Sequence, residues 1–422
     1  GFCAQVVMSI VEITGVANGG EGVGRLEDGR VCFVPYALPG DVVRVEGATA
    51  KKGVAWGSIA EVVQASPDRI AANCSVFGRC GGCSWLHFAY PAQGEWKRRI
   101  VQDCLRRIGR VEAEVGWLED AALRLGYRTR AEVHGSAGAS PSPAAATHTP
   151  AAEGGCPTRG GAWGFYEAGS REVVGIDACP LFHERLNEAF ATLRGLEADA
   201  SVELTVNPET GETLAWSAKL TPGLAELFPN TNDLHDGMAR HSFEFDGVPI
   251  VNGAFCQSSL LLNRLLVGEV HRSLEGADTV LDLYCGNGNL TLGLGASVNV
   301  FGVDHNRAGI AAAQAYRSDT YHAGGEKEFV RAIGDCAWDA IVLDPPRTGA
   351  KSIMSALAKA EAGKIVYVAC DAATLARDAG ALTAKGWRVE SVTAIDLFPN
   401  TPHVETVVVF GRVWVSGIGY RV

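Results

Sequence analysis

The order of hydrophobic and polar positions divides the chain into three regions of different character. Residues 1–65 alternate short apolar stretches with glycine-rich turns at 19–20 and 22–24. About five strands in a segment of this length predict a small closed β-barrel of the oligonucleotide-binding type, although a β-barrel without a ligand fits the pattern equally well. The apolar stretches are Val7–Ile13, Val31–Pro35, Asp41–Val45 and Ser58–Val63.

The last region, residues 250–422, alternates apolar runs with segments of helical character. Uninterrupted apolar runs separated by helices are typical of a largely parallel sheet in an α/β domain. The predicted strands are Thr279–Leu283, Asn299–Asp304, Ala340–Asp344, Ile365–Ala369 and Val404–Phe410.

The middle region, residues 66–249, is irregular and mixed. It contains a cysteine-rich segment from Cys74 to Cys83 and a basic, helix-like run at Glu95–Gly109. Residues 135–161 consist mostly of Gly, Ala, Ser, Pro and Thr, which cannot bury a core and therefore predict a flexible surface loop. We expect three domains, at residues 1–65, 66–249 and 250–422.

Composition and charge narrow the class of protein. Of the 422 residues, 47% are hydrophobic, which is enough apolar material to exclude wholesale disorder. No apolar run reaches ~18 residues and no secretory signal is visible, so we expect a soluble cytoplasmic protein that does not engage a membrane. The net charge of −11 argues against nucleic-acid binding by bulk charge but leaves room for a local basic face.

A glycine-containing segment in the last region indicates a nucleotide-like cofactor. Residues 282–289 (DLYCGNGN) follow a predicted strand and open a helix, and Asp304 ends the next strand. An acid about 20 residues beyond a glycine-rich loop is placed to bind ribose hydroxyls. Because the segment is not Gly-x-Gly-x-x-Gly, it favours S-adenosylmethionine over a dinucleotide; a purely structural glycine turn is the alternative.

Three further segments of this region carry candidate chemistry. Asp344 begins a DPPR segment at a strand end, where ligands bind in open α/β sheets. Cys370 lies between a strand and a helix expected from Ala372, so the helix dipole should lower its thiol pKa. His403 and Glu405 are expected at the start of the last strand, where a carboxylate can act as a base. Taken alone, Cys370 is more typical of a buried hydrophobe than of a nucleophile, and Glu405 is more typical of a solvated strand residue than of a base.

The cysteines of the middle region predict a metal site. Twelve cysteines without a signal peptide indicate a reducing compartment, where clustered cysteines mean metal binding or catalysis rather than disulfides. Cys74, Cys80 and Cys83 are closely spaced, and Cys179 is a candidate fourth ligand. Four thiolates hold either zinc or a [4Fe–4S] cluster, and the spacing does not choose between them.

The basic run is the candidate for a local nucleic-acid contact. From Lys97 to Arg110 it carries six basic residues and one acidic residue. Together with Arg124, Arg128 and Arg130 it predicts a phosphate-binding face. A solvated amphipathic helix explains the same residues equally well.

Taken together and in this order, these segments resemble the RNA (uracil-5-)-methyltransferase family over nearly the whole chain. The barrel sequence is similar to a TRAM domain, and the cysteine segment 74–93 is similar to the family's cluster segment. The last region contributes four motifs: DLYCGNGN, DPPRTG, ACDAATLARD and DLFPNTPHVE. The resemblance implies an α/β multidomain protein: an N-terminal TRAM (OB-like) β-barrel, a central mixed α+β domain with a four-cysteine cluster, and a C-terminal Rossmann-like methyltransferase domain.

The resemblance also implies roles for individual residues. Cys370 would be the thiolate nucleophile and Glu405 the base that removes a proton. A [4Fe–4S] cluster rather than zinc would be held by the four cysteines named above. S-adenosylmethionine would be contacted by Gln257, Tyr284, Asn289, Asp304 and Asp344. The implied partner is RNA, 23S rRNA first and the T-loop uridine of tRNA second, bound by a monomer.

The chain departs from the family pattern in three places. The usual Ser-Cys-Asn-Pro is Ala369–Ala372 here, the usual Gln-x-Asn is Gln257–Ser259, and the usual Gly-Asp near 324–326 has no Asp. These changes leave the catalytic pair intact. We therefore expect altered rate and affinity rather than another reaction. The alternatives are an RNA-binding cluster protein with decayed catalysis and, more weakly, a methyltransferase for DNA or a small molecule.

Overall fold

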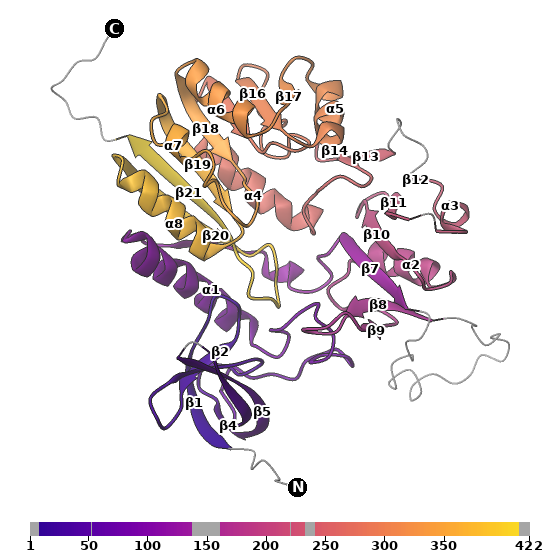
Figure 1. Cartoon of the computed structure of the whole chain (residues 1–422). Coiled ribbons are helices and arrows are strands. Elements are labelled where there is room, and N and C mark those ends of the chain that lie inside the picture. Colours follow the sequence, from indigo (N-terminus) through magenta and orange to yellow (C-terminus); the bar gives the residue numbers. More distant parts are fainter. Residues whose placement is uncertain (1–7, 52, 137–160, 220, 233–240, 413–422) are drawn as a thin grey trace.

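Figure 1 presents the computed structural model of the chain, which describes residues 8–51, 53–136, 161–219, 221–232 and 241–412. The strands of these described residues form a closed barrel, a six-stranded sheet, a two-stranded hairpin and an eight-stranded sheet. The flexible loop predicted at 135–161 lies almost entirely outside the described residues.

The first region forms a closed five-stranded barrel, as its alternating pattern predicts. Alternate residues such as Val11, Ile13, Val43 and Val45 fill its interior. The segment 22–24 is part of a strand rather than a turn: Gly24 pairs with β1, where a Cβ would lie 2.3 Å from a backbone oxygen. The strands are β1 (Ser9–Val16), β2 (Gly22–Arg25), β3 (Val31–Val34), β4 (Val42–Lys51) and β5 (Val54–Gln64), in the order β1-β2-β3-β5-β4.

The middle region contains a six-stranded sheet with helix α2 (Glu184–Leu193) packed on it. The apolar face of α2, with Leu186, Phe190 and Leu193, is buried against sheet residues such as Val202 and Leu204. The sheet order is β12 (Thr231–Asn232), β11 (Thr213–Trp216), β10 (Ser201–Val206), β7 (Arg130–Ser136), β8 (Ala162–Tyr166) and β9 (Val173–Gly175). The remaining elements are η2 (Ala121–Leu123), α3 (Leu224–Leu227) and the hairpin β13 (Ser242–Phe245) and β14 (Val248–Val251).

The last region is built on an eight-stranded sheet, and the predicted α/β architecture is confirmed. Its strands read as continuous apolar runs because both faces are covered: Leu281 and Leu283 belong to one hydrophobic cluster and Val280 to another. Every pairing is parallel except those of β21. The order is β17 (Tyr321–Ala323), β16 (Asn299–Asp304), β15 (Thr279–Leu283), β18 (Trp338–Leu343), β19 (Ala362–Ala369), β21 (Glu405–Arg412), β20 (Trp387–Ile395) and β6 (Gly116–Leu118).

Helices accompany this sheet, and side-chain caps fix where several of them begin. The Ser259 hydroxyl caps α4, Asn306 caps α5 and the Asp371 carboxylate caps α8. None of the helices in the described ranges is long and apolar enough to cross a membrane. The helices are α4 (Leu260–Ser273), α5 (Arg307–Tyr316), α6 (Glu326–Asp335), α7 (Met354–Leu357) and α8 (Ala372–Thr383).

One segment of the middle region packs with the last region. Helix α1 (Tyr90–Cys104) continues as the π-helical turn η1 (Leu105–Gly109), and both contact α8. Strand β6 then pairs with β20 at the edge of the eight-stranded sheet. Gly109 allows the close approach, because a Cβ there would lie 2.4 Å from the Ala376 carbonyl oxygen. The division into three domains stays a prediction, and this segment crosses its boundary at residue 250.

Candidate active site

Three parallel strands end side by side at the carboxyl edge of the eight-stranded sheet. Leu283 of β15 pairs in register with Val303 of β16 and with Leu343 of β18. The residues that directly follow these three are predicted cofactor contacts: Tyr284, Asp304 and Asp344. The fold therefore brings three of the five predicted contacts to the edge where ligands bind in open α/β sheets.

The loop after β15 is shaped by left-handed backbone conformations. Tyr284, Gly286 and Gly288 have φ values of 61°, 55° and 81°, which favour glycine at the last two positions. The Gly286 amide donates a 3.0 Å hydrogen bond to the carboxylate of Asp304. The acid at the end of β16 thus holds the glycine loop, in addition to any ligand it binds.

The other two predicted cofactor contacts lie near helix α4. Asn289 and Asn263 exchange two side-chain amide hydrogen bonds, of 2.7 and 3.1 Å, which tie the end of the glycine loop to α4. Gln257 is buried and lies just before the Ser259 cap of the same helix. Both residues are therefore placed by α4 rather than by the strand ends.

Asp282 was not among the predicted contacts, yet it is fully buried beneath the glycine loop. Its carboxyl group accepts a 2.5 Å hydrogen bond from the Thr291 hydroxyl. Burial raises the pKa of Asp282 to about 8, with smaller contributions from Asp344 and Asp304. A carboxyl inside a predicted buried strand is the signal that could have identified it.

Strand order brings Cys370 and Glu405 together. β21 lies between β19 and β20, and Ala369 of β19 pairs with Thr406 of β21. Cys370 follows Ala369 and Glu405 precedes Thr406, so the same antiparallel register sets Cys370 opposite Glu405. The predicted nucleophile and base, although distant in the sequence, are therefore neighbours at the same edge of the sheet.

The expected lowering of the Cys370 pKa is wrong for this structure. Burial, followed by the nearby carboxyl groups of Glu405 and Asp344, raises the pKa of the thiol to about 11. Arg347 acts in the opposite direction but is exposed. The helix N-terminus does not offset desolvation and two acids, so Cys370 is a thiol at neutral pH.

Glu405 is a buried carboxyl rather than the solvated strand residue of the alternative. Burial and the neighbouring Asp344 raise the pKa of Glu405 well above its usual range, and Arg347 opposes the shift. Its Oε1 atom is buried without a hydrogen-bond partner. Burial likewise raises the pKa of Asp344 to about 7. Arg347 is the positively charged residue that acts on both Cys370 and Glu405, and its place in the DPPR segment was the signal for it.

The loops around Cys370 are held from α8. Asp371 accepts a 2.7 Å hydrogen bond from the Thr374 amide and so caps the helix that follows the nucleophile. The Tyr367 hydroxyl donates a 2.7 Å hydrogen bond to Asp378 and accepts one of 3.1 Å from the Ala350 amide. The segment 369–372 thus has a cap of its own, although it lacks the family's usual hydroxyl and proline.

His403 does not lie on the last strand, contrary to expectation. β21 begins at Glu405, and His403 belongs to the preceding segment, where its side chain is exposed. It is therefore not fixed on the same strand face as Glu405.

The predicted basic face is only partly present. Lys97 is fully buried against Asp396, and Arg130 pairs with Glu203, so neither is available to phosphate. Arg99 and Arg107 remain exposed on α1 and η1, each paired with an acid. The spacing of Lys97 from Gln93 and Val101 on the buried face of α1 was the signal that could have revealed its position.

The four predicted metal ligands line one cavity. Cys74, Cys80 and Cys83 come from the segment before α1, and Cys179 comes from the loop between β9 and α2. The remaining walls are largely apolar, apart from Arg128. Burial and repulsion among the cysteines raise the pKa of Cys83 to about 12 and that of Cys179 to about 11, with Arg128 opposing both shifts. Four half-buried cysteines that line one cavity with one cation fit a metal-bound group, since thiolates are otherwise unfavourable there.

The arrangement of these four thiols bears on the kind of metal group that they could hold. In the ranges that the structure describes, no group of three or more His, Cys, Asp or Glu side chains is arranged to hold one metal ion. A zinc ion requires four sulfurs about 2.3 Å from one centre, whereas a [4Fe–4S] cluster binds each sulfur to a separate iron.

Comparison with known proteins agrees with this geometry. Residues 10–60 match the TRAM domain, and residues 320–413 match the tRNA (Uracil-5-)-methyltransferase family. Among solved structures, the Pyrococcus abyssi tRNA (uracil-54, C5)-methyltransferase in complex with S-adenosyl-L-homocysteine has a TM-score of 0.70. It is 23% identical and covers 95% of this chain and 99% of its own, which supports the fold.

Two curated relatives are similar over almost their full length. The 23S rRNA (uracil(1939)-C(5))-methyltransferase RlmD of Methylococcus capsulatus is 32% identical, covering 95% of this chain and 96% of its own. The protein of the same name from Alkalilimnicola ehrlichii gives the same three values. The chain belongs to the RNA (uracil-5-)-methyltransferase family, in the branch that carries a TRAM domain.

Proposed function

We propose that this chain transfers a methyl group from S-adenosylmethionine to carbon 5 of a specific uridine in 23S rRNA. The observation that carries the proposal is the register of β19 and β21, which sets a cysteine opposite a buried glutamate beside the cofactor edge. The relatives named above, which span nearly the whole chain, favour 23S rRNA as the substrate.

Cys370 and Glu405 divide the chemistry between them. Carbon 5 of uracil is a poor nucleophile, but addition of the Cys370 sulfur to carbon 6 converts the ring to an enolate that is nucleophilic at carbon 5. When bound, S-adenosylmethionine supplies the electrophilic methyl group. Glu405 then takes the proton from carbon 5, and elimination releases Cys370. Because the pKa values of Cys370 and Glu405 are both raised, each group must first give its proton to water, and the exposed Arg347 would favour the resulting thiolate and carboxylate.

We assign the cofactor to the edge formed by β15, β16 and β18. Asp304, at the end of β16, is placed for the ribose hydroxyls. Asp344, directly after β18, has a carboxyl group close enough to Cys370 to raise the pKa of its thiol, and it would attract the positively charged methyl donor. The proposed contacts are Gln257, Tyr284, Asn289, Asp304 and Asp344.

We assign the RNA to a groove between the barrel and α1. Phe33 and Trp96 line it together with Arg99 and Arg107. The Arg99 guanidinium lies 4.9 Å from the centre of the Trp96 ring. Aromatic faces beside arginines bind single-stranded RNA by stacking and charge. Asn18 also lines the groove, and its side-chain amide is 3.5 Å from the carboxylate of Asp371, the residue after Cys370.

Mapping of 5-methyluridine tests the function as a whole. Total RNA from a strain that lacks the gene should lose this nucleoside at one 23S rRNA position, and the gene supplied in trans should restore it. Loss in the T-loop of tRNA instead would identify the alternative substrate. Unchanged 5-methyluridine in every RNA would contradict the proposal and favour the RNA-binding protein with decayed catalysis.

We infer that Cys74, Cys80, Cys83 and Cys179 hold a [4Fe–4S] cluster. The inference is supported by four thiols that line one cavity, three from the segment before α1 and one from the loop before α2. Bound there, a cluster would supply four iron–thiolate bonds that tie the segment before α1 to the loop before α2. Arg128 would balance part of its negative charge.

Iron content tests this inference. Protein purified without oxygen should be brown and contain about four iron atoms per chain. Cys179→Ala should lose most of the iron, whereas Cys336→Ala, which removes an exposed cysteine, should retain it. A colourless protein with one zinc per chain would contradict the cluster and favour a structural zinc site.

The proposed enzyme acts in the cytoplasm as a monomer. Twelve cysteines, four of which line one cavity, fit a reducing compartment. The nucleophile, the base and the proposed cofactor contacts all come from one chain.

A further inference from the structure

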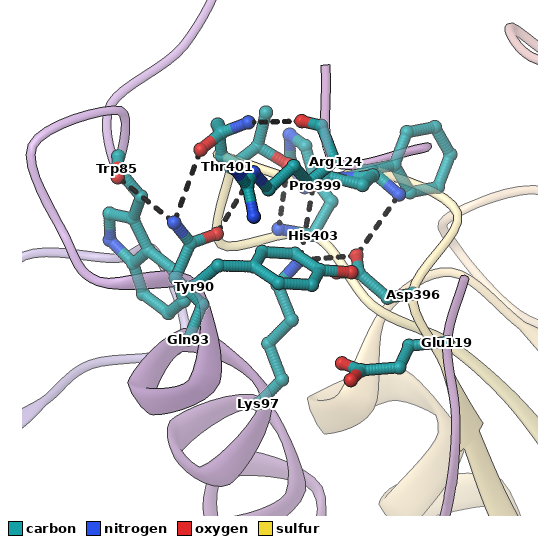
Figure 2. A network of polar contacts seen from close by, with 12 residues as sticks. Trp85, Tyr90, Gln93, Lys97, Glu119, Arg124, Asp396, Pro399, Thr401 and His403 are labelled. Carbon is teal, nitrogen blue, oxygen red and sulfur yellow. Dashed lines mark hydrogen bonds and ion pairs between the residues drawn. The ribbon is translucent and has the colours of Figure 1, made fainter. Parts of the chain in front are cut away.

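The segment 396–404 joins β20 to β21 and ends at the proposed base. Its first residue, Asp396, directly follows Ile395, which is the strand partner of Glu405. Whatever fixes Asp396 therefore fixes the strand end against which Glu405 lies. Figure 2 shows that side chains of α1 reach this segment from below.

Lys97 of α1 makes the central contact. Its ammonium group donates a 2.6 Å hydrogen bond to the Asp396 carboxylate (Figure 2). It donates a second hydrogen bond, of 3.0 Å, to the Phe398 carbonyl oxygen. The side chains of Lys97 and Asp396 are both 0% exposed. The Tyr90 hydroxyl, also from α1, donates a 3.0 Å hydrogen bond to the other oxygen of Asp396.

Gln93, one helical turn before Lys97, holds the middle of the segment. Its side-chain oxygen accepts a 2.9 Å hydrogen bond from the Asn400 amide, and its side-chain nitrogen donates to the Asn400 side chain at 3.2 Å. Asn400 has a φ of +65°, a left-handed conformation that these contacts stabilise. The Asn400 carbonyl oxygen also accepts a 3.0 Å hydrogen bond from the Trp85 amide.

A fully buried ion pair is an unusual way to attach a loop. Removing two charges from water is costly, and well-packed apolar residues often give equal or greater stability. The ion pair does fix the orientation of the segment 396–404, because the Lys97 ammonium group must contact both the Asp396 carboxylate and the Phe398 carbonyl oxygen. Phe398 in turn packs edge-on against the His403 ring, with centroids 5.9 Å apart. The contacts of Lys97 therefore define the path of the segment at both Asp396 and Phe398.

We propose that Lys97 and Gln93 are positioning residues for methyl transfer: from α1 they hold the segment 396–404 in one conformation, and so keep Glu405 in place beside Cys370. This proposal rests on the proposed function. Neither residue touches the reacting atoms; both act through the segment. Helix α1, which lines the proposed RNA groove, thus also orders the segment between β20 and β21 that leads to Glu405.

The test compares Lys97→Met with the double variant Lys97→Met, Asp396→Leu. In Lys97→Met, kcat should fall about 100-fold, as expected for misplacement of a catalytic group by about 1 Å. Affinity for S-adenosyl-L-homocysteine should change less than about threefold, because the proposed cofactor edge lies on other strands. The double variant removes the unpaired acid, so its Tm should recover while kcat stays low.

The double variant separates positioning from stability. Recovery of kcat together with Tm would overturn the proposal, since the pair would then only stabilise the fold. Unchanged kcat in Lys97→Met would overturn it as well. Lys385→Met, which removes an exposed lysine after α8, is the matched control and should behave as wild type. If Lys97→Met does not fold, Gln93→Met provides the same comparison without a buried unpaired charge.

Hydrogen exchange tests whether α1 orders the segment 396–404, and it does not depend on methyl transfer. Amides of 396–404 should exchange at least about tenfold faster in Lys97→Met and in the double variant, but not in Lys385→Met. Unchanged exchange would overturn the proposal even if methyl transfer is lost. Absence of methyl transfer in the wild-type protein would instead contradict the proposed function, while the exchange result would still report on the contact.

Discussion

Replacing Cys370 by alanine should reduce methyl transfer by roughly 10⁴-fold or more, because the proposed reaction depends on addition of its sulfur to carbon 6 of the uracil ring. Cofactor affinity should persist, since the proposed contacts of the cofactor lie on β15, β16, β18 and near α4. The measurement is transfer of labelled methyl from S-adenosylmethionine to undermethylated rRNA, beside calorimetric titration with S-adenosyl-L-homocysteine. Activity near that of wild type would reject Cys370 as the nucleophile.

The matched control for this variant is another cysteine replacement. Cys336→Ala removes an exposed thiol of the same region and should keep full activity.

The raised pKa of Cys370 can be tested in wild-type protein without RNA. Alkylation of Cys370 by iodoacetamide should become about tenfold faster with each pH unit between 7 and 9. The sign follows from the thiol pKa of about 11, below which the thiolate fraction rises with pH. A rate that is already constant at pH 7 would contradict the raised pKa.

Replacing Glu405 by glutamine should stall the reaction after methyl transfer. Glutamine keeps the shape of the buried carboxyl but loses the proton-accepting oxygen, so addition and methylation proceed while elimination slows by about 10²–10⁴-fold. The trapped species is methylated RNA covalently attached to Cys370. It should migrate as a slow band on a denaturing gel and carry label from the cofactor methyl group.

The trapped band can be assigned by two further variants. It should vanish in the Cys370→Ala, Glu405→Gln double variant, which has no sulfur to form the bond. Glu390→Gln, an exposed glutamate on the neighbouring strand β20, should turn over normally. Free 5-methyluridine formed at the wild-type rate by Glu405→Gln would show that another group is the base. His403 is the first candidate, although it lies on the segment before β21 rather than on the strand.

Much of the fold was accessible from the sequence because its signals are local. Both faces of strands such as β15 and β19 are buried, so each appears as an uninterrupted apolar run. The barrel appears as short alternating stretches between glycines. The cofactor and nucleophile motifs were found because the carboxyl ends of parallel strands, where such residues act, follow directly from the strand assignment.

The tertiary structure decided how distant residues meet and what environment they share. Only the insertion of β21 between β19 and β20 sets Glu405 opposite Cys370, and a hydrophobic pattern does not encode strand order. Burial then reversed the expected shift of the Cys370 pKa, because desolvation and two nearby acids outweigh the helix N-terminus. Burial also changes the role of Lys97: the basic run predicts it in a phosphate-binding face, whereas the fold encloses it with Asp396. The sequence by itself determined which chemical groups are available; packing determined their neighbours and exposure to water, and hence their charge.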